Sequence, residues 1–400
     1  MKVCFETFGC RLNRAEALDE EAKYIAAGWT TTEKHADADR IVVRGCSVTS
    51  RAQHECEHLV EHLRRHYPNT RVVVQGCMRL KTENRFASPV HPGRTEQLAD
   101  EPPVPTRTAR AYLKVQDGCS GKCTFCIVPQ FRGTSKSTDF TAVLDKAKHF
   151  IDAGYHEIVV TGCNLSLYAS QGKRLPDLLA ALAELGRGST LADTCRIRLG
   201  SIEPGACALE TVDAMSRHDN ICRFLHVTAQ SGSNNVLRAM MRPYQRADID
   251  NLLKNAVAKM PTIGLGCDIM TGFPGEMAPD FLSTQLLLEQ YPFSNCHVFP
   301  YSERPGTQAI NYPGSIPKDE RSNRAHRLSE LMTEKRRMAA RKFIGKEVEV
   351  LVEDEKKQAG WTSEYFWYKH SFDQPGMTSK TPRKSIAKVR VTGYRHGHLI

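Results

Sequence analysis

Three cysteines stand close together in the segment CSGKCTFC, as Cys119, Cys123 and Cys126. Gaps of three residues and then two allow the thiolates of one loop to converge on a single iron–sulfur cluster. Three protein ligands leave one iron of a [4Fe–4S] cluster open to a substrate or cofactor, whereas four thiolates close the cluster of an electron-transfer ferredoxin. Zinc is disfavoured, because zinc sites usually take four ligands from two clustered pairs and no second pair follows. The segment therefore predicts a cluster with an open iron.

A second set of cysteines ends three β-rich segments, CFETFGC, RIVVRGC and RVVVQGC. Cys10, Cys46 and Cys77 each follow a glycine, which lets the backbone approach a bulky group closely. If the three segments are strands of one parallel sheet, their ends meet at the same edge. We expect a second three-thiolate cluster there. The alternative is that the three cysteines are buried as small apolar residues.

The chain has 14 cysteines, and we expect the other eight to contribute to packing, since free cysteine is among the residues most often buried. Disulfides are not expected in a cytosolic chain of this size. The role of Cys163, in the segment VVTGCN, stays open, because it follows a strand and faces the expected site.

The elements that must position these residues alternate between strand and helix in the first third of the chain. β-rich runs cover residues 2–7, 40–44 and 71–75, and apolar residues with helical spacing lie between them. This β-α-β-α-β order predicts a parallel sheet. Four prolines between residues 92 and 105 indicate a linker.

The middle of the chain repeats the alternation. Strands are expected to begin near six positions: Ala111, Glu157, Arg196, Arg223, Leu265 and Cys296. Helical segments separate them, for example at residues 141–153 and 176–185. Six β/α units in about 200 residues are typical of an open or partial parallel barrel, whose sites lie at the C-terminal ends of the strands.

The end of the chain differs from the middle. A basic helical stretch covers residues 320–342, and three alternating runs follow, GKEVEVLVEDE, SEYFWYKH and AKVRVTGYRHG. They predict a small antiparallel β-barrel. We therefore expect an α/β protein with three domains, at residues 1–103, 104–340 and 341–400.

Composition limits the kinds of protein to consider. The 400 residues are 40% hydrophobic and 25% charged, as in a soluble globular protein. No apolar run reaches the ~18 residues of a membrane span, and the N-terminus lacks the pattern of a secretory signal, so we expect a cytoplasmic location.

The net charge of +10 is unevenly distributed along the chain. Residues 1–103 hold 15 basic and 15 acidic residues, whereas residues 341–400 hold 12 basic and 7 acidic residues. This end is expected to meet an anionic partner such as nucleic acid.

Several segments resemble the radical S-adenosylmethionine (SAM) methylthiotransferases. The resemblance covers nearly the whole chain and rests on DGCSGKCTFCIVPQFRG, which contains Arg132 and Gly133, and on SIEP, HVTAQSGS, RAMMRPY, GFPGE and HVFPYSERPGT. The ending resembles a TRAM domain, a small RNA-binding β-barrel. The resemblance implies an N-terminal parallel βα cluster domain, a central partial (β/α)6 radical SAM barrel and a TRAM-like C-terminal barrel.

The resemblance also implies cofactors, partners and a reaction. The cysteines of CSGKCTFC would hold a [4Fe–4S] cluster that binds S-adenosylmethionine and yields a 5′-deoxyadenosyl radical, which abstracts hydrogen from C2 of an adenine. Cys10, Cys46 and Cys77 would hold a second [4Fe–4S] cluster that delivers sulfur, and a second S-adenosylmethionine would supply the methyl group. The implied partners are a tRNA anticodon stem-loop, an electron donor and a sulfur source, without a membrane. The radical chemistry belongs to the cofactor, and the protein positions and shields it.

Three branches of this family differ in substrate. One acts on isopentenyladenosine in tRNA, one on an aspartate of ribosomal protein S12, and the MtaB type on N6-threonylcarbamoyladenosine at position 37 beside the anticodon. The opening TFGCRLNRAEA and the short, basic end resemble the MtaB type. Three segments depart from the usual family sequence: Arg44-Gly45 before Cys46, Thr228-Ala229 before Gln230, and TGCNLSLYAS. The cysteine ligands persist, so these departures concern substrate fit and cofactor packing.

Further residues of the cofactor pocket are expected from their positions. Phe125 matches the aromatic residue that lies by the adenine in the family. Four residues that follow strands are expected to line the pocket, although each is equally consistent with a turn or capping role: Asn164, Glu203, Gln230 and Ser231.

The C-terminal end holds the residues that are expected to contact RNA. The basic ones, for which a solvated face is the alternative, are Lys380, Arg383, Lys384, Lys388, Arg390 and Arg395. The aromatic run Tyr365, Phe366, Trp367 and Tyr368 is available for base stacking, although alternation along a strand lets only about half of it point outward.

Two functions of other classes remain open. A two-cluster electron-transfer protein would contain iron and sulfide but would not cleave S-adenosylmethionine. A non-catalytic RNA-binding protein would hold structural zinc, and its affinity for RNA would not respond to reduction.

Overall fold

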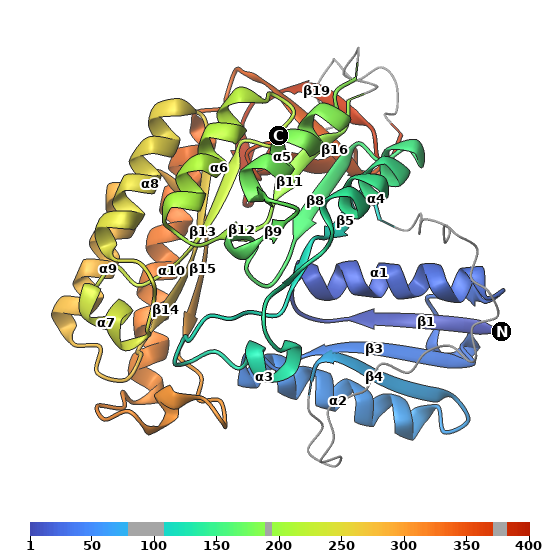
Figure 1. Ribbon diagram of the computed structural model, residues 1–400, viewed down its shortest axis with the longest axis horizontal. Coiled ribbons are helices and arrows are strands. Elements are labelled where there is room, and N and C mark those ends of the chain that lie inside the picture. Colours follow the sequence, from blue (N-terminus) through green and yellow to red (C-terminus); the bar gives the residue numbers. More distant parts are fainter. Residues whose placement is uncertain (79–107, 189–193, 371–381) are drawn as a thin grey trace.

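Helices and parallel strands alternate through most of the chain (Figure 1). The computed structural model describes residues 1–78, 108–188, 194–370 and 382–400. Among these residues, none of the helices is long and apolar enough to cross a membrane. The helices are α1 (Arg11–Ala26), α2 (Ser50–His66), α3 (Val128–Arg132), α4 (Phe140–Asp152), α5 (Leu175–Leu185), α6 (Ala206–Arg217), α7 (Asn234–Ala239), α8 (Arg246–Lys259), α9 (Ala278–Gln290) and α10 (Lys318–Arg341).

The N-terminal sheet contains β1 (Lys2–Thr7), β2 (Thr30–Thr31), β3 (Arg40–Cys46) and β4 (Arg71–Cys77), in the order β2-β1-β3-β4. All its neighbouring strands are parallel, and α1 and α2 cover opposite faces (Figure 1). Cys56, Val60 and Leu63 of α2 pack with Ile41 and Val43 of β3. The expected parallel sheet is confirmed, and β3 and β4 each extend two residues beyond the predicted ends, to the cysteines.

Glycines allow the ends of these strands to pack closely. Gly9 and Gly76 have φ angles of +87° and +86°, which other residues rarely adopt. A Cβ atom on Gly9 would lie 2.8 Å from Cβ of Cys46, and one on Gly76 would lie 2.8 Å from the carbonyl oxygen of Gly45. Glycine is therefore required at the sheet edge that carries the second cysteine set.

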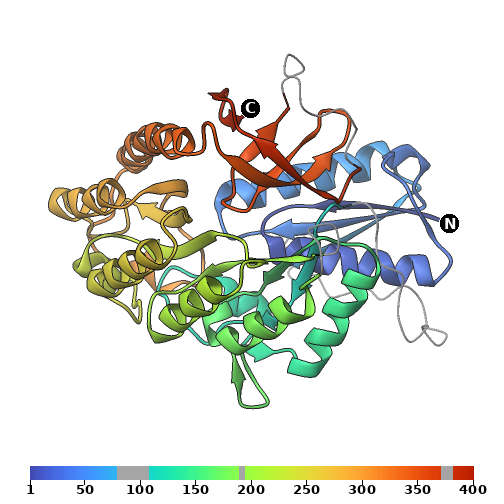
Figure 2. The same cartoon turned by 90° about the horizontal axis from the view of Figure 1, so that it is seen from above.

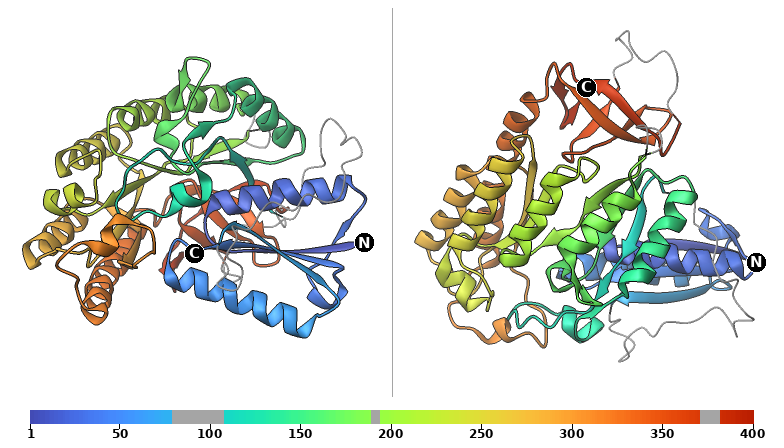
Figure 3. Two further views of the ribbon diagram at one scale, coloured as in Figure 1. Left: turned by 60° about the horizontal axis from the view of Figure 1, so that its bottom comes forward. Right: turned by 45° about the horizontal axis from the view of Figure 1, so that its top comes forward.

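Two parallel sheets form the wall of an open barrel, in the orders β11-β8-β5 and β12-β13-β14-β15. Their strands are β5 (Ala111–Lys114), β8 (Glu157–Thr161), β11 (Arg196–Leu199), β12 (Ser201–Ile202), β13 (Phe224–Gln230), β14 (Gly264–Thr271) and β15 (Phe293–Pro300). The helices α4, α5, α6, α8, α9 and α10 lie outside this wall (Figures 1 and 3). Five of the six predicted strands begin within one residue of the expected position, and β15 begins three residues earlier.

The N-terminal sheet is held against the barrel through α1. Ala15 and Leu18 of α1 pack on Tyr112 of β5 and Val159 of β8. These two strand residues lie on the inner face, because their sequence neighbours pack with the outer helices in the main core. The C-terminal ends of β1, β3 and β4 consequently come near α3, the short helix after the CSGKCTFC segment (Figure 1).

The C-terminal sheet lies across the end of the barrel at which the barrel strands begin (Figures 2 and 3). Its order is β19-β16-β17-β18-β21-β20, and its pairings are antiparallel except between β18 and β21. The strands are β16 (Glu347–Asp354), β17 (Ala359–Thr362), β18 (Trp367–Lys369), β19 (Ile386–Arg390), β20 (Tyr394–Arg395) and β21 (His398–Leu399). This antiparallel module agrees with the sequence prediction.

Buried charges join the C-terminal sheet to the barrel. Glu157 of β8 accepts from Arg196 and Arg198 of β11 at 2.6 and 2.7 Å. The two arginines also donate to the carbonyl oxygens of Trp361 and Thr362, at 2.7 and 2.9 Å. One carboxylate therefore anchors two arginines that reach across to the C-terminal sheet.

The aromatic run of the C-terminal sheet is mostly enclosed. Phe366 and Tyr368 are 1% and 2% exposed in the core of that sheet. The ring of Tyr365 stacks on Phe224 of β13 at 4.7 Å. Alternation turns two of them inward, as the sequence pattern predicted, and the barrel occupies the third. Base stacking is therefore a wrong prediction for these three side chains. Trp367 is half-buried.

Candidate functional site

The first cysteine set lies in the loop between β6 (Gln116–Asp117), which pairs with β7 (Lys136–Ser137), and α3. A Cβ atom on Gly121 would lie 3.2 Å from Sγ of Cys119 and 3.7 Å from Sγ of Cys123, so both sulfurs lie over the same backbone. Burial, together with the neighbouring thiols, raises the pKa of Cys126 to about 12. Three soft donors from one loop, two of which (Cys123 and Cys126) have pKa values raised mainly by burial, fit an iron–sulfur cluster, because bound iron favours the thiolate form.

Arg242 connects this set to polar residues at the barrel mouth. Its guanidinium donates to Sγ of Cys123 at 2.9 Å and to Glu203 at 2.5 Å. Asn164 donates to the other carboxylate oxygen of Glu203 at 2.8 Å. Two of the predicted pocket residues, Asn164 and Glu203, are thus adjacent to the CSGKCTFC loop.

The other three predicted pocket residues differ in their surroundings. Phe125 packs edge-on against Phe273, with ring centroids 6.5 Å apart. Gln230, at the end of β13, has a φ of +63°, and its buried Oε1 atom has no hydrogen-bond partner among the described residues, so it can accept from a bound cofactor. Ser231 is fully buried, and its hydroxyl contacts that of Thr284 in α9 at 3.1 Å, so it supports the outer layer instead of facing the barrel mouth.

The second cysteine set gathers at the edge of the N-terminal sheet. Cys46 and Cys77 are register partners at the ends of β3 and β4, and Cys10 immediately precedes α1. A Cβ atom on Gly9 would lie 3.1 Å from Sγ of Cys46. Burial raises the pKa of Cys77 to about 11, and the thiols of Cys10 and Cys46 act in the same direction. Three thiols therefore gather at this sheet edge, and like the first set they fit an iron–sulfur cluster.

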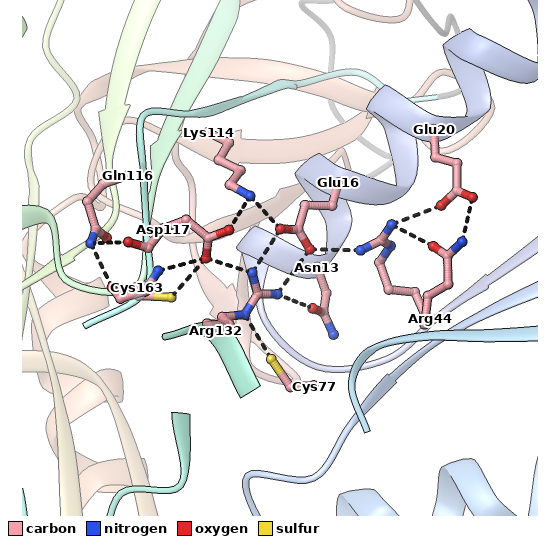
Figure 4. Close-up of polar contacts among 12 residues, drawn as sticks. Asn13, Glu16, Glu20, Arg44, Cys77, Lys114, Gln116, Asp117, Arg132 and Cys163 are labelled. Carbon is pink, nitrogen blue, oxygen red and sulfur yellow. Dashed lines mark hydrogen bonds and ion pairs between the residues drawn. The ribbon is translucent and has the colours of Figure 1, made fainter. Parts of the chain in front are cut away.

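Arg132 connects the helix that follows the first set to Cys77 of the second set (Figure 4). It ends α3, the helix that begins two residues after Cys126, and its Nε donates to Sγ of Cys77 at 2.8 Å. The same guanidinium contacts Glu16 at 2.8 Å and Asn13 at 2.9 Å, both on α1. One side chain of the barrel loop therefore contacts the second cysteine set and the helix that holds it.

Acidic residues around Arg132 stay ionised. Burial opposes ionisation of Asp117, but a hydrogen bond from Lys114 and the charges of Lys114 and Arg132 outweigh it and lower the pKa of Asp117 to about 2. The pKa of Glu16 is lowered in the same way, against burial, by Arg132 and Lys114. The contact between the N-terminal sheet and the barrel is therefore an ion-pair network at neutral pH.

Cys163 lies beside this network. Its Sγ is 3.6 Å from Asp117 and its pKa is raised well above the ordinary value, mainly by burial. Its neighbourhood includes Cys77 and Arg132. Of the other cysteines expected to be structural, five are buried, Cys4, Cys56, Cys195, Cys222 and Cys267, and Cys207 and Cys296 are half-buried.

The basic residues expected to contact RNA lie on the C-terminal sheet and the loops before it. The exposed ones are Arg383, Lys388, Arg390 and Arg395. Lys384 places its Nζ 3.9 Å from the centre of the Tyr155 ring, so it also ties this module to the barrel. Lys380 lies outside the described residues.

Arg242, Glu16 and Asp117 were not among the predicted site residues. Each is a single polar residue whose importance depends on contacts distant in the sequence. The signal that could have found them is their place in the segments that carry the family resemblance: Arg242 in RAMMRPY, Asp117 in DGCSGKCTFCIVPQFRG and Glu16 in TFGCRLNRAEA.

Known proteins match this arrangement in sequence. The Radical SAM superfamily matches residues 113–288, and the Uncharacterized protein family UPF0004 matches residues 2–91. Threonylcarbamoyladenosine tRNA methylthiotransferase MtaB of Bacillus subtilis is 30% identical over 91% of this chain and 89% of that protein. The protein of that name from Aquifex aeolicus is 29% identical, over 89% of this chain and 94% of that protein. This chain belongs to the MtaB-type radical SAM methylthiotransferases.

A solved structure shares the fold of this chain. A solved radical S-adenosylmethionine methyltransferase, TsrM from Kitasatospora setae with cobalamin and a [4Fe–4S] cluster, has a TM-score of 0.54 at 13% identity, covering 77% of each chain. The superfamily match includes Cys119, Cys123 and Cys126, and the UPF0004 match includes the second set. Family membership brings S-adenosylmethionine and a [4Fe–4S] cluster as cofactors of this enzyme.

Proposed function

We propose that this methylthiotransferase adds a methylthio group to C2 of N6-threonylcarbamoyladenosine at position 37 of tRNA. The observation that carries the proposal is that Arg132, in the helix that follows the first three-cysteine set, donates to Cys77 of the second set, since sulfur insertion at an unactivated carbon needs both a radical source and a sulfur carrier. Soft thiolate ligands suit iron–sulfur chemistry at both positions. The similarity to the proteins named MtaB supports the choice of nucleoside.

The six cysteines have separate proposed roles. Cys119, Cys123 and Cys126 hold the cluster that binds S-adenosylmethionine, and Cys10, Cys46 and Cys77 hold a second [4Fe–4S] cluster. When bound, the cofactors supply a 5′-deoxyadenosyl radical, a sulfur atom and a methyl group. The side chain of Arg132 fixes the second set relative to the first, because it contacts Cys77 directly and ends the helix that follows Cys126.

The remaining residues position and shield the cofactor. Arg242 donates to Cys123 and holds Glu203, which in turn orients Asn164. The proposed cofactor contacts are Phe125, Asn164, Glu203 and Gln230, and the unpartnered Oε1 of Gln230 accepts from a polar group of the cofactor. Ser231 acts through packing against α9.

RNA contact is assigned to the C-terminal module. Its exposed side chains Arg383, Lys388, Arg390 and Arg395 can neutralise phosphates of an anticodon stem-loop, as Lys and Arg do in nucleic-acid interfaces.

We divide the chain into a cluster domain at 1–103, a radical SAM core at 104–340 and a TRAM-like domain at 341–400. The reaction also requires an external electron donor and a sulfur source.

Anaerobic reconstitution tests this assignment of the cysteines. The proposal predicts about eight irons per chain, as two [4Fe–4S] clusters contain, and formation of 5′-deoxyadenosine on reduction with S-adenosylmethionine. The triple Ala variant of Cys10, Cys46 and Cys77 should keep about four irons and still cleave S-adenosylmethionine, but should no longer transfer sulfur. Iron without cleavage would instead indicate an electron-transfer protein, and zinc in place of iron at the two cysteine sets would indicate a structural metal.

The nucleoside itself is tested with purified tRNA. Substrates carrying threonylcarbamoyladenosine or isopentenyladenosine at position 37 are compared, because a tRNA-2-methylthio-N(6)-dimethylallyladenosine synthase of Clostridium novyi is 29% identical to this chain over 88% of it. Methylthiolation of the first alone supports the proposal. Methylthiolation of the second alone would reassign the substrate.

A further inference from the structure

Two histidines and one aspartate meet on three adjacent strands of the barrel: His226 on β13, Asp268 on β14 and His297 on β15. Nε2 of His226 and Nδ1 of His297 each lie 3.1 Å from the same oxygen of Asp268. The three ligand atoms all lie within 4.8 Å of one another. They contact neither cysteine set in any hydrogen bond or ion pair among the described residues.

This group faces the space inside the barrel. Val227 and Cys267, the sequence neighbours of His226 and Asp268, pack with the outer helices in the main core, so the period of two along a strand turns His226 and Asp268 inward. Exposure of the side chains rises across the sheet, from 9% at His226 through 22% at Asp268 to 66% at His297. The group is therefore anchored at one end and open to solvent at the other.

Gly266 makes room for this arrangement. It lies on the same face of β14 as Asp268, two residues earlier. A Cβ atom there would lie 2.8 Å from Nδ1 of His226 and 2.7 Å from the Phe224 ring. Because glycine leaves this space free, the His226 ring can lie across β14 and present its Nε2 atom to Asp268.

We propose that His226, Asp268 and His297 bind one divalent transition-metal ion. Two imidazole nitrogens and one carboxylate oxygen form a donor set that suits Zn²⁺ and similar ions. Three protein ligands leave at least one coordination position free, as in sites that bind a further ligand. Because the His297 side chain is 66% exposed, solvent can reach that position. Binding of the ion replaces the two hydrogen bonds that the imidazoles make to Asp268.

The test uses the full-length protein with its iron–sulfur clusters reconstituted anaerobically. Zn²⁺ is titrated calorimetrically, and zinc and iron are measured after gel filtration. Wild type should retain one zinc per chain in addition to its iron. His297→Asn and Asp268→Asn should each weaken zinc binding at least ~tenfold, the lower end of the effect of removing even a supporting residue of a metal site. Their iron content should equal that of wild type, which shows that they fold.

Two control variants make the result specific. His326 pairs with Glu330 on the exposed face of α10, so His326→Asn removes a histidine–carboxylate pair without a third ligand and should leave zinc binding unchanged. Cys4, Glu6 and His35 form another group within ligand distance, and His35→Gln tests it. The proposal is overturned if wild type retains no zinc, if the His297 and Asp268 variants bind zinc as wild type does, or if only His35→Gln abolishes binding.

Discussion

The Nε atom of Arg132 lies 2.8 Å from the sulfur of Cys77, although the two residues belong to different modules of the protein and are 55 positions apart. The guanidinium also pairs with Glu16 and Asp117. Docking of the N-terminal sheet on the barrel and placement of the second cysteine set thus depend on the same side chain.

Replacing Arg132 by Gln should destabilise the protein strongly. The Arg132 side chain is 8% exposed, and its loss leaves Asp117 paired with Lys114 and Glu16 paired with Lys114 and Arg44. Removing one partner of a buried ion pair costs about 3–5 kcal/mol, so the urea midpoint should fall clearly. Arg51→Gln is the control, because its pair with Glu55 is exposed and should not change the midpoint. Equal midpoints for Arg132→Gln and wild type would contradict the role of Arg132.

Glu157 should make stability dependent on pH. Burial opposes its ionisation, but Arg198 and Arg196 outweigh burial and lower its pKa well below the ordinary value of 4.5. A lowered folded-state pKa adds stability that is fully present above the unfolded-state value and is lost as the pH falls below it. The difference in stability between wild type and Glu157→Gln should therefore be greatest near neutral pH and shrink below pH about 4.5.

Thermal unfolding between pH 3.5 and 8 measures this difference. The control is Glu55→Gln, which alters an exposed carboxylate paired with Arg51. A constant difference between wild type and Glu157→Gln across the range would show that the carboxylate charge does not hold the C-terminal sheet to the barrel.

Arg242 should tune the cluster that the first cysteine set is proposed to hold. Its side chain is 5% exposed and donates to Sγ of Cys123. Hydrogen bonds to cluster sulfurs and nearby charge set reduction potentials, so Arg242→Gln should make the potential more negative. Production of 5′-deoxyadenosine should fall by roughly 10–100-fold, as for other residues that support metal ligands. Redox titration followed by electron paramagnetic resonance gives the potential. The control is Arg246→Gln, because Arg246 pairs with Asp250 in α8 and donates to no cysteine among the described residues. An unchanged potential would refute the proposed effect.

Removing the exposed charge of the C-terminal module should weaken tRNA binding in a salt-dependent way. Ala at Arg383, Lys388, Arg390 and Arg395 should reduce the slope of log affinity against log salt by roughly 0.7–0.9 for each phosphate that is no longer neutralised. Four exposed basic residues on the barrel serve as the control: Lys173, Arg187, Arg238 and Lys254. If the control variant reduces the slope as much as the C-terminal variant does, RNA binds elsewhere.

The cysteine sets and the strands that carry them were predictable because their signals are local. Apolar runs such as RVVVQGC mark a buried parallel strand, and the glycine marks its end. The closeness of Cys46 and Cys77 follows from strand order alone, since register partners in a parallel sheet lie side by side. Spacing likewise identified the CSGKCTFC loop.

Contacts between modules were not predictable in the same way. The stacking of Tyr365 on Phe224 and the pairing of Arg132 with Glu16 depend on how separate sheets dock. Exposed and buried members of an aromatic run look alike in sequence until a partner surface is known. The position of Ser231 after a strand suggested a pocket residue, but the chain turns there and its hydroxyl meets α9.

Mass spectrometry of tRNA nucleosides from cells with and without the gene measures the proposed reaction at its product. We predict that the methylthio form of threonylcarbamoyladenosine disappears without the gene and returns with the wild-type gene, but not with the Cys119→Ala or Cys77→Ala variant. Unchanged threonylcarbamoyladenosine methylthiolation, together with loss of methylthio from isopentenyladenosine or from ribosomal protein S12, would contradict the proposed function.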